Sequence, residues 1–485
     1  MRFPAARDDD ASARLLRRIF VVAGVVASAL FIIVGLAFDL QTYGDGSIFS
    51  YAVATREVWA FHWHNIATRA ATYALTLAPG EIAVALTGSP QAGVFVYGLC
   101  LFAAPALSLA ATYALDRAPH RPYFVFACAS TALLCPLVLG FPTEMWIAHA
   151  LFWPAFACAM TFPISRASSV LLAALTTALA LAHEGGLVLA FGIVIASALR
   201  GFRDARCLRA LACTALAVVV WLVVNRFAQP DSYFGEVRLR AASEFFESRI
   251  FASPLLTLLL ATLAAYALLC AVLSRLAVRR AALIAATLVG AGLAVWWSAF
   301  DHALHTDNRY YFRTILLLGT CGLAAVCGLM QLAQEKSIVG RFVPLRALPA
   351  MLRTEGIVRF ALGAAALIML VHVVETAKFV RGFSAYRTAV RALASGETAD
   401  PALGAPFLVS SKRIDNDLGR LSWFSTTPYL SVLVTGFAPR RLVVDPAGNY
   451  FWLSCATASE AAREQRVVPQ ETREMIRVYS CLHRN

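Results

Sequence analysis

The chain has 485 residues, of which 59% are hydrophobic and only 15% charged, and its mean hydropathy is +0.67. Soluble domains carry about 25% charged residues, so this composition excludes a water-soluble fold and predicts an all-α polytopic membrane protein. The net charge of +13 does not indicate nucleic-acid binding, because the arginines form short clusters between long apolar runs, as in the cytoplasmic loops of membrane proteins.

The first 18 residues are polar and end in Arg14, Arg17 and Arg18, directly before the apolar run 19–38. That run is about 20 residues long, which is enough to cross a bilayer. A cleavable signal peptide has a shorter apolar core and a small-residue cleavage site. We therefore expect a cytoplasmic N-terminus, residues 1–18, followed by a retained signal-anchor.

Hydropathy predicts about eleven spans. Between them, arginine-rich loops alternate with loops that are poor in basic residues, and the basic loops mark the cytoplasmic side. This alternation predicts a multi-pass protein of a bacterial inner membrane. The spans are 19–38, 92–115, 122–140, 144–162, 168–182, 186–199, 210–228, 254–273, 281–299, 314–332 and 359–376.

The moderately apolar stretch 62–87 is not counted as a span. Counting it would invert every later loop and put the basic cluster from Arg200 to Arg209 outside. The region 47–87 is also interrupted by Pro79-Gly80 and contains several charged residues, which suits helices lying in the headgroup plane. Spans 168–182 and 186–199 are short, so we expect the His183-Glu184 tip between them to line a wet recess.

Charged residues and turn signals return after residue 377, and residues 377–485 are expected to form a small α/β domain. Its expected strands are 407–409, 441–444 and 475–479, and 458–466 is expected to be helical. An odd number of spans places this domain in the periplasm, where a disulfide between Cys455 and Cys481 is plausible. The other cysteines lie mostly in apolar segments, as small buried hydrophobic residues do.

Ionisable residues collect in the loops assigned to the outer face, and such residues near a membrane often mark function. Asp45, between Gly44 and Gly46, is either a turn former or a carboxylate available as a general base or metal ligand. The other candidates are Glu144, His183, Glu184, Asp307, Arg309 and Arg313. Glu144 also suits a helix N-terminus, and the last three also suit an ordinary ion-pair set or an arginine clamp for phosphate.

The organisation around Tyr43-Gly44-Asp45-Gly46-Ser47 resembles the GT-C superfamily of membrane glycosyltransferases. The likeness lies in the first span, the long outer loop to about residue 87, the many spans and the outer C-terminal domain, and it extends over residues 19–376. It departs from the superfamily at two points. Asp45 has no acidic neighbour, and Trp296-Trp297 is followed by Ser298, which argues against an oligosaccharyltransferase.

The resemblance implies inverting transfer of a sugar from a polyprenyl-phosphate donor to a lipid-linked or cell-envelope glycan acceptor. Asp45 would be the catalytic base or would bind a divalent metal, with Asp39 in reserve. Arg309 and Arg313 would neutralise the phosphate, and Glu144, His183 and Glu184 would line the sugar pocket, with Asp307 beside them. The expected partners are the donor, the acceptor and membrane lipids. No cofactor is implied with certainty.

The sequence is also compatible with two other functions. A transporter or flippase of a lipid-linked or anionic solute would place charges near the membrane midplane and often shows internal repeats, and no repeat is visible here. A polymer ligase of the O-antigen ligase type would use a late outer loop, and 300–313 would be its counterpart. The donor distinguishes the enzymes: a monophosphate sugar for the first and a diphosphate glycan for the ligase.

Overall fold

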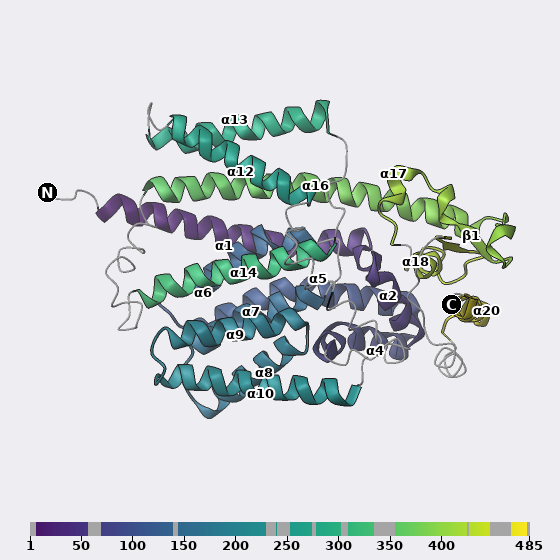
Figure 1. The fold of residues 1–485 in the computed structure, drawn as a ribbon, viewed down its shortest axis with the longest axis horizontal. Helices are drawn as coiled ribbons and strands as arrows, with labels where there is room; N and C mark the ends of the chain where they lie inside the picture. The colour runs from purple at the N-terminus through teal and green to yellow at the C-terminus, as the bar shows by residue number, and fades with distance from the viewer. Residues whose placement is uncertain are drawn as a thin grey trace.

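The fold was obtained as a computed structural model, which describes residues 6–56, 69–138, 144–228, 239, 253–273, 278–301, 309–333, 355–423, 426–446 and 467–482. It is mostly helical. Long helices run side by side to form an elongated body, and a smaller C-terminal segment lies at one end of it (Figure 1). We call this end, where helix α1 (Ala6–Ala37) finishes, the distal end, and the opposite end the N-terminal end.

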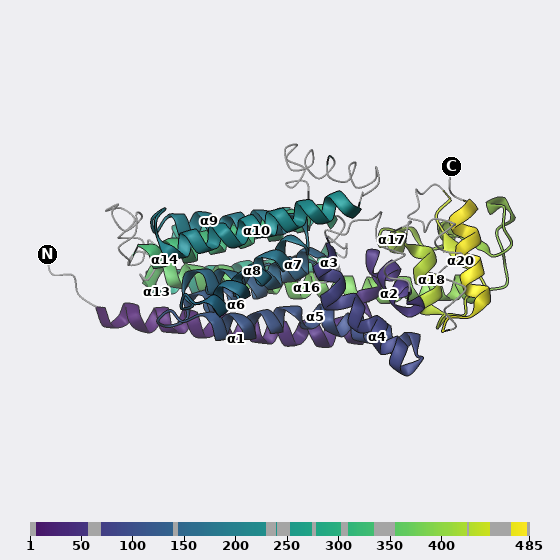
Figure 2. The ribbon, with the colours of Figure 1, turned by 90° about the horizontal axis from the view of Figure 1, so that it is seen from below.

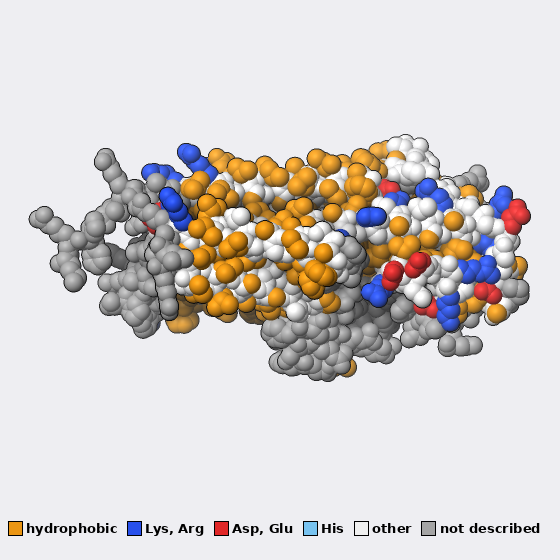
Figure 3. All heavy atoms as spheres, turned by 90° about the horizontal axis from the view of Figure 1, so that it is seen from above, with side chains coloured by type: hydrophobic (Ala, Val, Ile, Leu, Met, Phe, Trp, Pro, Cys, Tyr) orange, Lys and Arg blue, Asp and Glu red, His pale blue; other side chains and the backbone are white. Residues whose placement is uncertain are grey.

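Eight helices of the described residues are long and apolar enough to cross a membrane, and three shorter helices are also apolar. Apolar side chains cover the flank of the body, while lysines and arginines gather at the N-terminal end and charges of both signs near the distal end (Figure 3). A protein whose sides face lipid has this distribution. The multi-pass helical class is therefore supported, whereas the count of eleven spans stays a prediction.

Several helices begin where the sequence carries a start signal. Pro90 and Pro122 occupy the first turns of α5 (Pro90–Leu115) and α6 (Pro122–Leu133), where proline's missing N–H costs nothing. Ser89 caps α5 by accepting a hydrogen bond from the N–H of Ala92. Helix α8 (Arg166–Ala180) begins with a reciprocal cap between Ser165 and Ser168.

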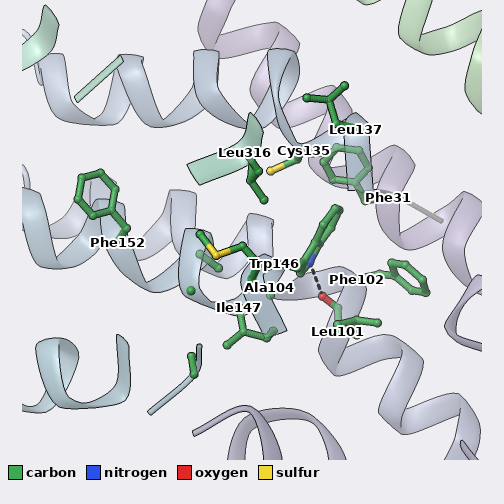
Figure 4. Packing of buried hydrophobic residues seen from close by; sticks show 14 of the residues in the cluster. Phe31, Leu101, Phe102, Ala104, Cys135, Leu137, Trp146, Ile147, Phe152 and Leu316 are labelled. Atoms are coloured by element: carbon green, nitrogen blue, oxygen red, sulfur yellow. Dashed lines mark hydrogen bonds between the residues drawn. The ribbon is translucent and has the colours of Figure 1, made fainter. Parts of the chain in front are cut away.

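Glycine lets the helices approach closely. Gly24 of α1 lies against the backbone of Cys128 in α6, and Gly35 lies against the ring of Phe102 in α5. A β-carbon at either glycine would overlap its neighbour, so α1 is fixed by small-residue contacts typical of membrane helices. Around them, Phe31, Phe102 and Trp146 form the packed core near the distal end (Figure 4).

Helix α7 (Glu144–Met160) is the central helix of the body, and every residue in it except Leu151 is buried. The indole N–H of Trp146 donates to the carbonyl of Leu101. At the other end of α7, buried Arg209 of α10 (Ala205–Ala228) donates to the carbonyls of Cys158 and Ala159. These bonds satisfy carbonyl groups that a helix C-terminus leaves without partners.

Residues 70–87 could span a membrane by length and composition, but both of their ends lie at the distal end. The N–H of Ala71 donates to the carbonyl of Leu181 at the end of α8, and Gly80 packs against Gly93 at the start of α5. The segment comprises α3 (Ala70–Thr72), the π-helical turn η4 (Tyr73–Leu77) and α4 (Ala78–Thr87). Its last helix, α4, packs against α5 at the distal end (Figure 2).

Helix α2 (Asp45–Thr55) differs from the expected helix in the headgroup plane, because all of its residues are buried. It is enclosed by α5 on one side and by α18 (Thr427–Val434) of the C-terminal segment on the other. The prediction of a headgroup-level helix failed because the residues that cover α2 lie almost 400 positions away in the sequence. Local hydropathy does not reveal such distant contacts.

Helix α16 (Glu355–Ser395) runs through residue 377, the predicted domain boundary, without a break. Its 41 residues span about 60 Å, roughly twice the hydrocarbon thickness, so it extends well beyond a membrane. Strands β1 (Leu408–Ser410) and β2 (Leu442–Val444) pair in parallel, close to two of the predicted strands.

The third predicted strand, 475–479, is wrong because these residues belong to helix α20 (Gln470–Leu482). Its buried residues Thr472, Ile476 and Tyr479 are spaced by four and three positions, which is the spacing of one helix face. The predicted helix 458–466 lies outside the described residues, as does Cys455. The side chain of Cys481 is likewise not described, so the disulfide stays a prediction.

The C-terminal segment shares a hydrophobic core with α2. Ile48 and Tyr51 of α2 pack in one cluster with Leu408, Tyr429 and Leu442, and the rings of Tyr51 and Tyr429 lie 5.4 Å apart. The hydroxyl of Ser47 also donates to the carbonyl of Thr426. The segment is thus packed onto the distal end rather than attached by a linker.

This shared core predicts that Leu408→Ala destabilises the protein by about 3 kcal/mol, because truncating a fully buried leucine leaves a cavity. The expected readout is a lower apparent melting temperature of the purified protein in detergent, with earlier proteolysis of the C-terminal segment. Leu86→Ala, at a leucine that is 81% exposed, is the matched control. Equal melting of the two variants would contradict the shared core.

Candidate functional site

Asp45 is the first residue of α2 and lies at the distal end of the body. Gly44 before it has φ +56°, and a β-carbon there would meet the indole of Trp423 at 2.9 Å. Glycine is therefore required both for the backbone conformation and for the space. The carboxylate of Asp45 is 3.6 Å from the guanidinium of Arg313 in α14 (Arg309–Leu332).

Arg69 joins two further segments to this end. Its guanidinium lies 2.5 Å from the carboxylate of Glu144, the first residue of α7, and 3.6 Å from that of Glu184, the first residue of α9 (Glu184–Ala198). Burial alone would lower the pKa of Arg69, but the two carboxylates outweigh it and raise that pKa above its usual range. The guanidinium therefore stays charged and holds both helix starts.

His183 caps α9 and supplies a fixed hydrogen-bond donor. Its Nδ1 accepts from the N–H of Gly185 at 2.9 Å, and its Nε2 is 3.7 Å from the carboxylate of Glu184. Burial lowers the pKa of His183 to about 4, although Glu184 acts in the opposite direction. The ring is therefore neutral at pH 7, and acceptance at Nδ1 puts its proton on Nε2.

These residues form one electrostatic unit, which we call the distal cluster and which consists of Asp45, Arg69, Glu144, His183, Glu184 and Arg313. The charge of Asp45 acts on Arg69, and the charge of Arg313 acts on His183. The buried ring of Tyr97 lies within electrostatic reach of both Glu144 and Asp45. With three carboxylates, two guanidiniums and a neutral imidazole, the cluster has a carboxylate in excess.

The structure brings together five of the residues expected from the sequence: Asp45, Glu144, His183, Glu184 and Arg313. Asp307 lies outside the described residues. Arg309 begins α14 one turn before Arg313, but its side chain is not described. Asp39, the reserve for Asp45, lies apart in a left-handed turn, where its carboxylate is 2.7 Å from Arg387 of α16.

Sequence reasoning missed Arg69, which it placed among headgroup-level residues. The sequence did contain a signal, because Arg69 lies in a largely apolar stretch that was assigned to the outer side. A charged residue in such a stretch needs a buried partner of opposite charge. A second group was also missed. Lys378 of α16 lies 3.1 Å from Glu375 and 3.3 Å from Asp301, which follows α13 (Val278–Ala299).

Within the described ranges, no three carboxylate, imidazole or thiol groups converge as metal ligands would. Binding of a divalent metal at Asp45 therefore stays a prediction. No protein-family model matches the chain, and no curated protein is significantly similar to it.

The hairpin that carries His183 and Glu184 depends on Gly186. A β-carbon at Gly186 would lie 1.9 Å from the carbonyl oxygen of Leu179 in α8, whereas nothing lies within 4 Å of one at Gly192 in the same helix. We expect Gly186→Ala to lower the apparent melting temperature by several degrees, because a backbone atom has to move. Gly192→Ala, the matched control, should leave it unchanged or raise it slightly. A Gly186→Ala protein with the melting temperature of the wild type would contradict this packing.

Proposed function

We propose that the protein is an inverting membrane glycosyltransferase of a bacterial inner membrane, with its distal end in the periplasm. It would move a sugar from a polyprenyl-phosphate donor to a lipid-linked or glycan acceptor. The observation that carries the proposal is the pair formed by Asp45 and Arg313. A buried carboxylate, only 9% exposed, faces a half-buried guanidinium across 3.6 Å at one end of a membrane-type helical body.

The pair supplies the two charges that this reaction needs. Arg313 lies beside the carboxylate of Asp45 and balances its charge. An arriving donor phosphate competes for the guanidinium, whose planar fork suits phosphate oxygens. Once Arg313 turns to the phosphate, the Asp45 carboxylate loses a stabilising partner and becomes a better proton acceptor.

The reaction then proceeds by a single displacement. The acceptor hydroxyl oxygen bonds to the anomeric carbon and gives its proton to Asp45, while the bond from that carbon to the phosphate oxygen breaks. The bonding electrons leave with polyprenyl phosphate, and Arg313 stabilises the charge that develops there. The leaving group is already an anion, so no strong general acid is needed.

The rest of the cluster suits sugar hydroxyl groups. One carboxylate oxygen of Glu184 is buried and has no hydrogen-bond partner among the described residues, so it can accept from a hydroxyl. The Nε2–H of His183 beside it can donate. Arg69 keeps Glu144 and Glu184 ionised, so it acts as a positioning residue.

The position of these groups favours an enzyme over a transporter. Transporters bind substrate near the bilayer midplane at broken helices. Here the distal cluster lies where α2, α7, α9 and α14 begin, at one end of the body.

Asp45→Asn is expected to lower the rate of sugar transfer by at least about a hundredfold, since general-base catalysis contributes 10²–10⁴-fold. Transfer is measured as release of polyprenyl phosphate from a radiolabelled polyprenyl-phosphate sugar in proteoliposomes. Asp39→Asn, at the carboxylate paired with Arg387, is the matched control and should stay active. An Asp45→Asn protein with normal melting and normal transfer refutes the base assignment, and sugar lipid moved without cleavage identifies a flippase.

Arg313→Gln is expected to lower kcat/KM for the donor by roughly a hundredfold, the usual cost of removing one group that stabilises developing charge. The same assay measures it, with Arg387→Gln as the control at an arginine paired with Asp39. A parallel assay with a diphosphate-linked glycan separates the two enzyme classes. Activity on that donor alone would assign the protein to polymer ligation.

A further inference from the structure

A groove runs along the side of the body between α1 and α16. Its volume is about 670 Å³, and its walls include Ala23 and Val34 of α1, Phe38 directly after α1, and Met369, Ala377 and Arg381 of α16. Both helices run from the N-terminal end toward the distal end (Figure 1). The groove therefore extends along the direction in which lipid chains lie.

The length of the groove suits the hydrocarbon chain of a lipid. The sixteen residues from Ala23 to Phe38 correspond to about 22 Å along the helix axis, most of the thickness of a hydrocarbon core. A groove of this length can hold the greater part of an extended hydrocarbon chain. Apart from Thr376 and His372, the lining of the groove below Arg381 is apolar. The ring of His372 is already bonded to the carbonyl of Leu133.

Arg381 is the one charged residue in this lining, and it stands at the distal mouth. Its side chain is exposed and has no ion-pair or hydrogen-bond partner among the described residues. By contrast, Arg387, a turn and a half further along α16, is paired with Asp39. An unpaired guanidinium at the end of an apolar groove complements an anionic headgroup.

A second groove gives a comparison. It lies between α12 (Pro254–Leu273) and α13, has a volume of about 650 Å³, and carries no charged residue in its lining. Nothing there selects a headgroup, so ordinary membrane lipid can fill it. The α1–α16 groove differs because its lining contains one positively charged side chain, Arg381.

We propose that the α1–α16 groove binds polyprenyl phosphate, with the isoprenoid chain along the groove and the phosphate on Arg381. The choice of this lipid, with its single chain, rests on the proposed function, whereas the apolar chain and the anionic head follow from the lining of the groove. The site is separate from the place of transfer. Phe379 and Phe383 hold Tyr43 on the face of α16 opposite Arg381, with ring centroids 4.9 and 5.1 Å away.

The test measures binding of radiolabelled undecaprenyl phosphate to the full-length protein in detergent. Arg381→Gln should weaken binding roughly tenfold, as expected for loss of a charge-assisted contact, and Arg381→Lys should retain part of it. Ala377→Phe, which fills the groove at an exposed alanine, should weaken it too. Undecaprenol, which lacks the phosphate, and dioleoylphosphatidylglycerol, which has two chains, should compete poorly.

Matched controls are Arg359→Gln, at the other end of α16 and paired with Glu355, and Ala264→Phe, at an exposed alanine of α12 outside both grooves. Both should bind like the wild type. Equal binding by Arg381→Gln, or equal competition by dioleoylphosphatidylglycerol, overturns the proposal. Asp45→Asn should abolish transfer yet leave this binding intact, so failure of the lipid site and failure of the proposed enzyme are separate results.

Discussion

The guanidinium of Arg69 lies between the carboxylates of Glu144 and Glu184, where the starts of α3, α7 and α9 meet. A buried charge is tolerated only with opposite charge beside it, so each partner fixes the position of the others. Removing any one would leave an uncompensated charge and loosen three segments that are distant in the sequence. The geometry around Asp45 and His183 depends on this arrangement, because their own helices begin at the same end.

The distal cluster is neutralised largely from within. Arg313 forms an ion pair with Asp45, and Arg69 forms ion pairs with Glu144 and Glu184. Because both guanidiniums are already paired with carboxylates, an anionic ligand has to replace one of these carboxylates. A phosphate can replace Asp45 at Arg313, whereas a neutral sugar can use the remaining carboxylate oxygen of Glu184 and the N–H of His183. The proposed donor combines both kinds of group in one molecule.

Much of this arrangement was predictable because helices of alternating direction bring alternate loops to the same end. That rule alone placed Asp45, Glu144, His183, Glu184 and Arg313 together. The alternation of helix direction does not show which charged side chains form ion pairs. Arg69 was therefore expected at the level of the headgroups instead of in the cluster. Local patterns failed where distant segments decide the environment. Helix α2 is covered by the C-terminal segment. Residues 475–479 are β-like in composition, yet their burial follows the helical spacing of Thr472, Ile476 and Tyr479.

The shared core of α2 and the C-terminal segment has a consequence for biosynthesis. Helix α2 leaves the ribosome early, but the residues that enclose it, such as Tyr429 and Leu442, are made only after the last long helix. Contacts between distant segments form late. The surroundings of Asp45 are therefore completed only when nearly the whole chain has been made, and a prematurely terminated chain would lack the residues that enclose α2.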